Sequence, residues 1–305
     1  MSVQVEDQGG LLPLFSDQLA RAVERAGASI VRVEARRRQA ASGVAWAAEG
    51  VILTADHVLE REEDLSVGLP DGETVAARIL GRDPGTDIAL LKVEGASLTP
   101  IEQGPSPKVG HLGLIVARPG DGLETSIGVV SALGGPARTR RGGQLEGFIR
   151  TDAEFYPGFS GGPLVDTGGT MIGLATSRFS QGAGLAIPLE TVRRVTTALT
   201  SHGRVRRGFL GLSSQPVALP EALRTKHGLS QESGLLVVGV ESGGPAEQAG
   251  LMMGDVLLQL GVQPVHDTDD LRNLLSGDRV GQATPARVLR GGEPRDLTVT
   301  IGERK

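Results

Sequence analysis

The sequence has no cysteine and few aromatic residues: its 305 residues include 0 Cys, 1 Trp, 1 Tyr and 6 Phe. A disulfide framework, a thiol nucleophile and a cysteine-ligated metal site are therefore excluded. No apolar run is long enough to span a bilayer, and the start, "MSVQVEDQGGLLPLF", lacks the basic region and apolar core of a signal peptide. We expect no membrane span and, as written, a cytoplasmic protein; if a leader was removed, we expect a periplasmic or extracellular one.

Neither sign of charge is in large excess. The net charge is -5, and 22% charged with 39% hydrophobic residues is typical of a soluble globular protein. This balance argues against a broad nucleic-acid surface, although it leaves room for a local basic patch. We find no P-loop and no clustered metal ligands, so no nucleotide, metal or other cofactor is expected.

The chain is long enough for two domains. "LFSDQLARAVERAG" predicts a short helix from Leu14 to Gly27 with Ser16 as its N-cap. Short apolar runs separated by turn residues follow, and together with 45 Gly they indicate an all-β sandwich or barrel rather than βαβ units. "PLETVRRVTTALTSHG" then predicts a helix between Pro188 and Gly203.

A second domain follows the linker-like "RVRRG". It has four predicted strands, a short helix at "PAEQAG" and a helix at "DTDDLRNLLSG" with Asp267 as its cap. We therefore divide the chain into an N-terminal segment (1–28), a mainly β domain (29–200), a linker (201–207) and a small α+β domain (208–305).

One serine lies between two glycine-rich turns in "YPGFSGGPLVD", residues 156–166. Such a segment is an ordinary turn in many proteins. It also suits a nucleophile, because glycines hold the Ser160 hydroxyl exposed and leave the N–H groups of Gly158 and Ser160 available for a developing oxyanion. A serine hydroxyl is weakly nucleophilic, so this interpretation requires a base.

Histidine is the usual base, and the chain has five: His57, His111, His202, His227 and His266. His57 is the best placed, because it follows the apolar strand "GVILTAD" and can open into a cleft from a rigid element. His111 is a candidate on residue type alone. A lone histidine is more often structural, so His57 also needs a partner.

The partner should be a carboxylate that orients the imidazole. "GRDPGTDIALLKVE" offers Asp83, which precedes a proline and is typical of a turn, and Asp87, which directly precedes the apolar run 88–91. We select Asp87. The order His57, Asp87, Ser160 is that of chymotrypsin-type double barrels rather than of subtilisins or α/β-hydrolases.

Five segments resemble the HtrA (Deg-type) serine proteases. They are "ILTADHVL", "GRDPGTDIALLKVE", "FIRTDAEFYPGFSGGPLVDTGGTMIGLATS", "GAGLAIPLETVRRV" and "GFLGL…SGLLVVGVESGGPAEQAGLMMGDVLLQLGVQPV". The resemblance covers nearly the whole chain. It implies a chymotrypsin-like double β-barrel, hence a mainly β fold, followed by a PDZ domain. It also implies His57, Asp87 and Ser160 as the triad.

The resemblance further implies an ATP-independent endopeptidase of protein quality control and stress response, which cleaves unfolded polypeptides. Its PDZ domain would bind apolar C-terminal peptides through the loop of Phe209, Leu210, Gly211 and Leu212. By position, the first specificity pocket falls on Phe155, Ser177 and Leu185. None is acidic, so we expect a small or medium apolar residue before the cleaved bond. A homotrimer is implied, assembled through "LLPLFSDQ" with Phe15.

Three positions depart from the family pattern. Tyr156 and Phe159 replace residues that are usually asparagine, and with Phe155 they form either an apolar wall of the cleft or part of the core. In the second domain Gly261-Val262 replaces an Asn-Gly hairpin and is compatible with a II′ turn.

An arginine run falls in a loop between two barrel strands, where the family has a regulatory loop. Such a run is more often solvated surface, and here it comprises Arg138, Arg140 and Arg141.

Two alternatives remain open at this point. The chain could be a catalytically silent chaperone or PDZ-type adaptor, a reading that the changes at Tyr156 and Phe159 keep open. It could also be a protease for one dedicated target, which differs only in substrate range.

Overall fold

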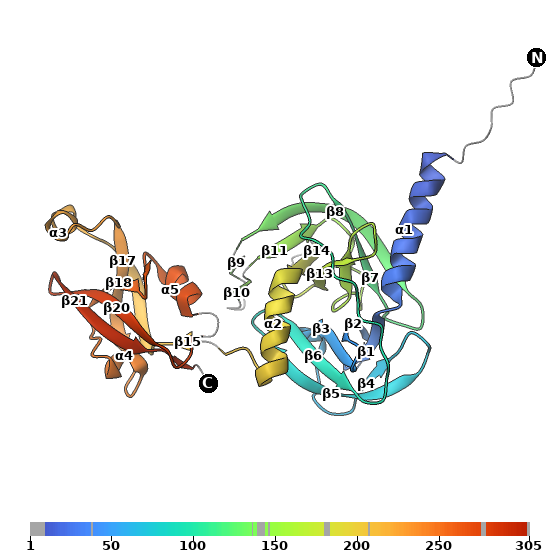
Figure 1. Ribbon diagram of the computed structural model, residues 1–305, viewed down its shortest axis with the longest axis horizontal. Coiled ribbons are helices and arrows are strands. Elements are labelled where there is room, and N and C mark those ends of the chain that lie inside the picture. Colours follow the sequence, from blue (N-terminus) through green and yellow to red (C-terminus); the bar gives the residue numbers. More distant parts are fainter. Residues whose placement is uncertain are drawn as a thin grey trace, which may run out of the picture. The chain divides into compact units, whose positions relative to one another are not determined.

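The structure is a computed structural model that describes residues 10–37, 39–135, 137–138, 144–145, 147–179, 184–206, 208–275 and 279–303. The chain divides into two compact units, residues 1–205 and 206–305. Figure 1 shows a mainly β first unit that includes α1 and α2, and a second unit of strands and short helices.

The first unit begins with a closed antiparallel barrel in the strand order β1-β2-β3-β6-β5-β4. Its elements are β1 (Ile30–Glu34), β2 (Ala41–Ala47), β3 (Val51–Ala55), the 3₁₀ turn η1 (Asp56–Val58), β4 (Leu65–Gly68), β5 (Thr74–Asp83) and β6 (Ile88–Val93). Strand residues that alternate along the chain, such as Val31 and Val33, fill its interior.

A second closed barrel has the order β11-β14-β13-β12-β7-β8. Its strands are β7 (Leu112–Ala117), β8 (Glu124–Gly134), β11 (Phe148–Thr151), β12 (Pro163–Val165), β13 (Met171–Thr176) and β14 (Gly184–Pro188). Two six-stranded barrels confirm the predicted chymotrypsin-like fold. Between β8 and β11, β9 (Ala137–Arg138) pairs with β10 (Gln144–Leu145). Arg138 is thus on β9, whereas Arg140 and Arg141 lie outside the described residues.

Two helices belong to this unit. α1 (Leu11–Gly27) begins at Leu11, so the predicted start at Leu14 and the Ser16 cap are wrong. Pro13 lies in the first turn, where a missing N–H costs no helical hydrogen bond. α2 (Leu189–His202) confirms the second predicted helix, with Gly203 left-handed at φ 70°. α2 contacts β5 and β6 of one barrel and β13 and β14 of the other, and so joins the two.

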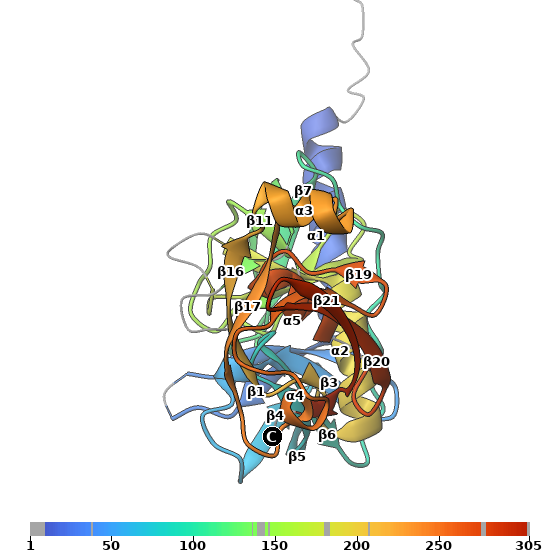
Figure 2. The ribbon, with the colours of Figure 1, turned by 90° about the vertical axis from the view of Figure 1, so that its left-hand side faces the viewer.

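The second unit contains a sheet in the order β16-β17-β18-β20-β21 (Figure 2). Leu271 and Leu274 of α5 are buried in the same core cluster as residues of this sheet. Its strands are β15 (Gly208–Phe209), β16 (Leu212–Ala218), β17 (Ser233–Val240), β18 (Val256–Leu260), β19 (Gln263–Pro264), β20 (Ala283–Arg290), β21 (Glu293–Thr300) and β22 (Gly302–Glu303). Its helices are α3 (Glu221–His227), α4 (Pro245–Gln248) and α5 (Thr268–Leu275).

The local predictions for this unit hold in part. Asp267 Oδ1 accepts the N–H groups of Asp269 and Asp270 and so caps α5, as predicted. Gly261 has φ 66° in the two-residue β18–β19 hairpin, which is compatible with a II′ turn. Helix α3 was not predicted, because it buries no residue and carries no apolar stripe. Within the described ranges, no helix combines the length and apolarity that crossing a membrane requires.

Candidate active site

The loop between β11 and β12 carries Ser160, whose exposed fraction is only 5%. Gly158 and Gly161 have φ values of 88° and 89°, a region that other residues resist. A Cβ atom at Gly161 would lie 2.1 Å from the carbonyl oxygen of Ser42. Ser42, on β2 of the other barrel, donates its hydroxyl to Gly158 O (2.9 Å) and its N–H to Ser160 O (3.2 Å). The first barrel therefore fixes the backbone of the serine loop.

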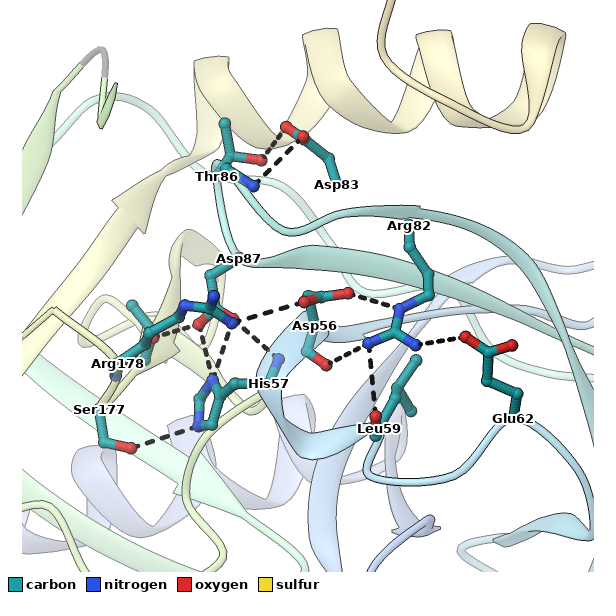
Figure 3. A network of polar contacts seen from close by, with 12 residues as sticks. Asp56, His57, Leu59, Glu62, Arg82, Asp83, Thr86, Asp87, Ser177 and Arg178 are labelled. Carbon is teal, nitrogen blue, oxygen red and sulfur yellow. Dashed lines mark hydrogen bonds and ion pairs between the residues drawn. The ribbon is translucent and has the colours of Figure 1, made fainter. Parts of the chain in front are cut away.

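His57 and Asp87 meet because they flank adjacent strands. His57 lies in η1 directly after β3, Asp87 directly precedes β6, and Ala55 pairs with Ile88. Asp87 is fully buried, with φ 60°, and accepts the His57 N–H at Oδ1 (2.9 Å) and His57 Nδ1 at Oδ2 (2.8 Å). A carboxylate can only accept, so Nδ1 carries the proton and Nε2 offers a lone pair. Figure 3 shows the ring held in this way.

Further side chains surround Asp87 (Figure 3). Thr176, at the end of β13, donates its hydroxyl to Asp87 Oδ2 (2.5 Å). Arg178 Nη1 lies 3.6 Å from Asp87 Oδ1 and 3.5 Å from Oδ2 of the buried Asp56. Asp56 also accepts Arg82 Nε (2.6 Å). Arg82 Nη1 also donates to Glu62 Oε1 (3.1 Å), so three carboxylates and two guanidinium groups form one cluster.

The sequence prediction missed this cluster. Asp56 gave a usable signal, because an acidic residue follows the apolar run "VILTA" directly before the candidate histidine. Arg178 and Thr176 gave none, since they come from a distant strand.

The nucleophile and the base are connected through a third hydroxyl. Ser160 Oγ lies 3.0 Å from Ser177 Oγ and accepts the Ser177 N–H (3.2 Å). Ser177 Oγ in turn lies 3.4 Å from His57 Nε2. Ser177 therefore stands between Ser160 and His57, although its predicted place was in the specificity pocket.

The predicted oxyanion donors lie on the serine loop. Within the part of the chain that the structure describes, the N–H groups of Gly158 and Ser160 have no hydrogen-bond acceptor. Both are available to a developing negative charge.

The three aromatic residues near Ser160 occupy different environments. Phe159 is fully buried in the core of the second barrel, and half-buried Phe155 packs against the same cluster. Tyr156 is 44% exposed and meets Phe159 edge to face, with ring centroids 5.3 Å apart. Its hydroxyl donates to Glu154, which raises the pKa of the phenol. Of the two readings left open, core packing holds for Phe159, and Tyr156 is at the surface.

The other predicted pocket residues lie near the same end of the second barrel. Leu185 pairs with Thr176, the neighbour of Ser177, and the Phe155 ring lies against Gly184. Residues 180–183, between these strands, lie outside the described residues.

The remaining titratable candidates are elsewhere. Asp83 accepts the Thr86 hydroxyl (2.7 Å) within its turn, as expected for a turn residue. His111 Nδ1 accepts the N–H of Lys108 in another turn, and His202 is exposed at the end of α2. His227 and His266 belong to the second unit. Among the described residues, no three His, Cys, Asp or Glu side chains are grouped as metal ligands.

The predicted peptide-binding loop of the second unit leads into an edge strand. Phe209 ends β15, Gly211 is left-handed at φ 73°, and Leu212 begins β16, which stands at the end of the sheet order. The Leu210 side chain is buried in the core of this unit. The carbonyl groups of Leu210 and Gly211 accept the N–H groups of Ala246 and Glu241, so the loop backbone is held by hydrogen bonds within this unit.

Sequence comparisons identify both domains. The profile described as "Trypsin-like peptidase domain" matches residues 41–174, and the profile "PDZ domain" matches residues 208–301. A "Probable periplasmic serine endoprotease DegP-like" of Ectopseudomonas mendocina is 34% identical over 304 residues, which are 97% of this chain and 63% of that protein. The chain thus spans less than two thirds of the length of this curated relative.

Solved structures match this chain over nearly their whole length. "HtrA-type protease AlgW with decapeptide" superposes with a TM-score of 0.79 at 32% identity, over 94% of this chain and 99% of that one. The serine endoprotease from Yersinia pestis has a TM-score of 0.78 at 30% identity, over 94% and 98% of the two chains. Together with the two barrels and the PDZ sheet, these matches show that the chain belongs to the HtrA family of serine proteases.

Proposed function

We propose that this chain is a serine endopeptidase that cleaves unfolded polypeptides without ATP. The observation that carries the proposal is the His57 ring, whose Nδ1 is held by buried Asp87. Its Nε2 lies 3.4 Å from Ser177 Oγ, which in turn lies 3.0 Å from Ser160 Oγ. A carboxylate that orients the imidazole in this way prepares it to act as the base for a serine nucleophile.

In the proposed reaction, Ser160 attacks the scissile carbonyl carbon and its proton passes to His57. Asp87 fixes the tautomer and stabilises the imidazolium that forms. The N–H groups of Gly158 and Ser160 stabilise the oxyanion, each such donor being worth roughly a hundredfold to a thousandfold in rate. His57 then protonates the leaving amine, and water hydrolyses the acyl-enzyme. Phe155 and Leu185 line the pocket for the residue before the cleaved bond, whereas Ser177, which was also predicted there, has its hydroxyl between Ser160 and His57.

The test is digestion of a permanently unfolded protein by the chain and by its Ser160→Ala variant. Cleavage by the former only, with a fluorophosphonate label that mass spectrometry places on Ser160, is the expected result. If neither protein cleaves and Ser160 takes no label, the chain is a silent chaperone or adaptor. The absence of a direct hydrogen bond between Ser160 and His57 in the described structure favours that second candidate. A panel of folded proteins separates a general protease from one with a dedicated target.

We also propose that the second unit, residues 208–305, binds apolar C-terminal peptides. β16 is an edge strand, so a peptide can pair with it, and the backbone N–H groups of Phe209 to Leu212 can receive the terminal carboxylate. Fluorescence polarisation with an apolar peptide tests this, and the same peptide with an amidated C-terminus is the matched control. Equal affinity for both would contradict carboxylate capture.

The proposed assembly is a homotrimer formed through α1. Leu11 and Leu12 are 86% and 80% exposed, and Phe15 is 45% exposed, an unusual apolar surface for a monomer. Light scattering should give a trimer that the double variant Leu11→Gln, Leu12→Gln disrupts. An unchanged mass in that variant would place the contact elsewhere.

The proposed compartment is the periplasm. The names of curated relatives give that location, and the expectation of a cytoplasmic protein finds no support in them. Fractionation of the producing cells tests the proposal.

A further inference from the structure

Ser177 is the residue through which the candidate nucleophile meets the candidate base. Its hydroxyl lies 3.0 Å from Ser160 Oγ and 3.4 Å from His57 Nε2, and its N–H donates to Ser160 Oγ. Among the described residues, Ser160 and His57 share no direct hydrogen bond. The polar connection between the two groups therefore runs through Ser177.

The direction of this hydrogen-bond chain follows from its ends. His57 Nδ1 donates to Asp87, so Nε2 can only accept from a hydroxyl. Ser177 then donates its hydroxyl proton to Nε2 and accepts the hydroxyl proton of Ser160. The Ser177 N–H fixes the position of Ser160 Oγ in this chain. Both hydroxyl protons point toward the imidazole.

We propose that Ser177 is a further catalytic residue that relays the proton from Ser160 to His57; this proposal rests on the proposed function. As Ser160 Oγ forms its bond to the carbonyl carbon, the Ser160 O–H bond breaks and that proton goes to Ser177 Oγ. The original Ser177 proton moves to His57 Nε2, and the carbonyl π electrons become the oxyanion. Ser177 begins and ends the step as a neutral hydroxyl, so atoms and charge balance.

The placement of the three groups suits this role. Ser160 is buried, whereas Ser177 is exposed and adjoins Thr176, which is bonded to Asp87. A base can act through one intervening hydroxyl or water, and catalytic hydrogen bonds that are long in a free enzyme tighten when substrate binds. The 3.4 Å contact to Nε2 is the one we expect to shorten.

The experiment compares Ser177→Ala, which removes the relay hydroxyl but keeps the N–H to Ser160, with Ser177→Thr, which restores a hydroxyl. For hydrolysis of a peptide amide we expect kcat to fall by roughly 10- to 100-fold in Ser177→Ala, part of the contribution of general base catalysis, with KM little changed. Ser177→Thr should recover most of this loss. A proton inventory in H₂O–D₂O mixtures should be curved for the unsubstituted chain, where two protons move, and linear for Ser177→Ala.

The outcomes separate this proposal from the proposed function. If the unsubstituted chain cleaves and is labelled at Ser160, the protease stands. A kcat for Ser177→Ala that is unchanged or higher, or an unchanged proton inventory, then overturns the relay. A label on Ser177 instead of Ser160 would also overturn it, because Ser177 would itself be the nucleophile. If the unsubstituted chain neither cleaves the substrate nor takes the label, the proposed protease activity is refuted, and the proposed relay is refuted together with it.

Discussion

Replacing Phe159 by alanine should destabilise the first unit strongly, although the residue is next to the candidate nucleophile. The ring is fully buried in the core of the second barrel. Truncation of a buried phenylalanine costs about 3–5 kcal/mol, from lost transfer free energy and the cavity that remains. The buried surface area gives a similar free energy. An aromatic side chain buries about 150–250 Å², which corresponds to about 4–6 kcal/mol as an upper bound.

Urea denaturation followed by tryptophan fluorescence measures this effect in the right unit, because the single tryptophan, Trp46, lies on β2 and packs against the first unit's core. With a slope of about 2 kcal/mol per molar urea, the midpoint should fall by about 1.5–2.5 M. Both proteins should carry Ser160→Ala so that self-cleavage does not interfere.

Tyr156→Ala is the matched control, since this ring is 44% exposed and its loss should cost much less. If Phe159→Ala shifts the midpoint no more than Tyr156→Ala does, the aromatic ring is not a core residue. The reading of Phe159 as core packing would then be refuted.

Three further predictions concern the triad, the serine loop and the PDZ domain. Asp87→Asn should lower turnover about ten-thousandfold in a peptide hydrolysis assay, because the amide would hold the wrong tautomer of the His57 imidazole. The fold should persist, since asparagine tolerates the observed φ of 60°. Unchanged turnover would mean that another carboxylate orients His57. Gly161→Ala should abolish activity and lower the melting temperature, because its Cβ would lie 2.1 Å from a carbonyl oxygen. Gly72→Ala, at a similar φ in open space, should show the backbone strain alone and therefore a smaller fall in melting temperature with activity kept; equal losses in the two variants would contradict this. Burial raises the pKa of Asp255, but the hydrogen bonds from Arg290 and a backbone N–H outweigh it and hold that pKa below its usual value. Ionised Asp255 thus stabilises the folded second unit above about pH 4, and this stabilisation is lost as the pH falls through the pKa of Asp255 in the folded state. Hydrogen exchange should therefore show the second unit loosening in acid, and Asp255→Asn should remove that part of the pH dependence; an identical acid response in the variant would count against it.

The sequence predicted the parts of the site that have local signals. Ser160 has its glycines, Asp87 its position before a buried strand, and His57 its place after one. Asp56 had a local signal, but its contacts with Arg82 and Arg178 could not be predicted, because they form only where η1, the end of β5 and the residues after β13 meet across the barrels. Such contacts depend on tertiary packing and leave no periodic pattern in the chain.

The inward direction of Phe159 was equally hidden. An aromatic residue between Gly158 and Ser160 can point toward solvent or core, and the turn residues around it fit both. Its direction is set by the second barrel, whose core residues come from all six of its strands. The early start of α1 was missed for a different reason, since Pro13 reads as a break although it is acceptable in a first turn.

The two edges of the PDZ sheet differ in a way that bears on aggregation. Both barrels are closed, so their paired strands offer no row of unpaired backbone groups to the unfolded chains that this protein is proposed to handle. In the PDZ sheet, the outer strand β21 carries Glu293, Pro294, Arg295 and Asp296, residues that discourage the addition of another strand. β16, at the opposite edge, also contains a proline, Pro216, but carries no charged residue. If the PDZ domain binds extended segments as proposed, the difference in charge favours β16 over β21 as the strand that accepts them.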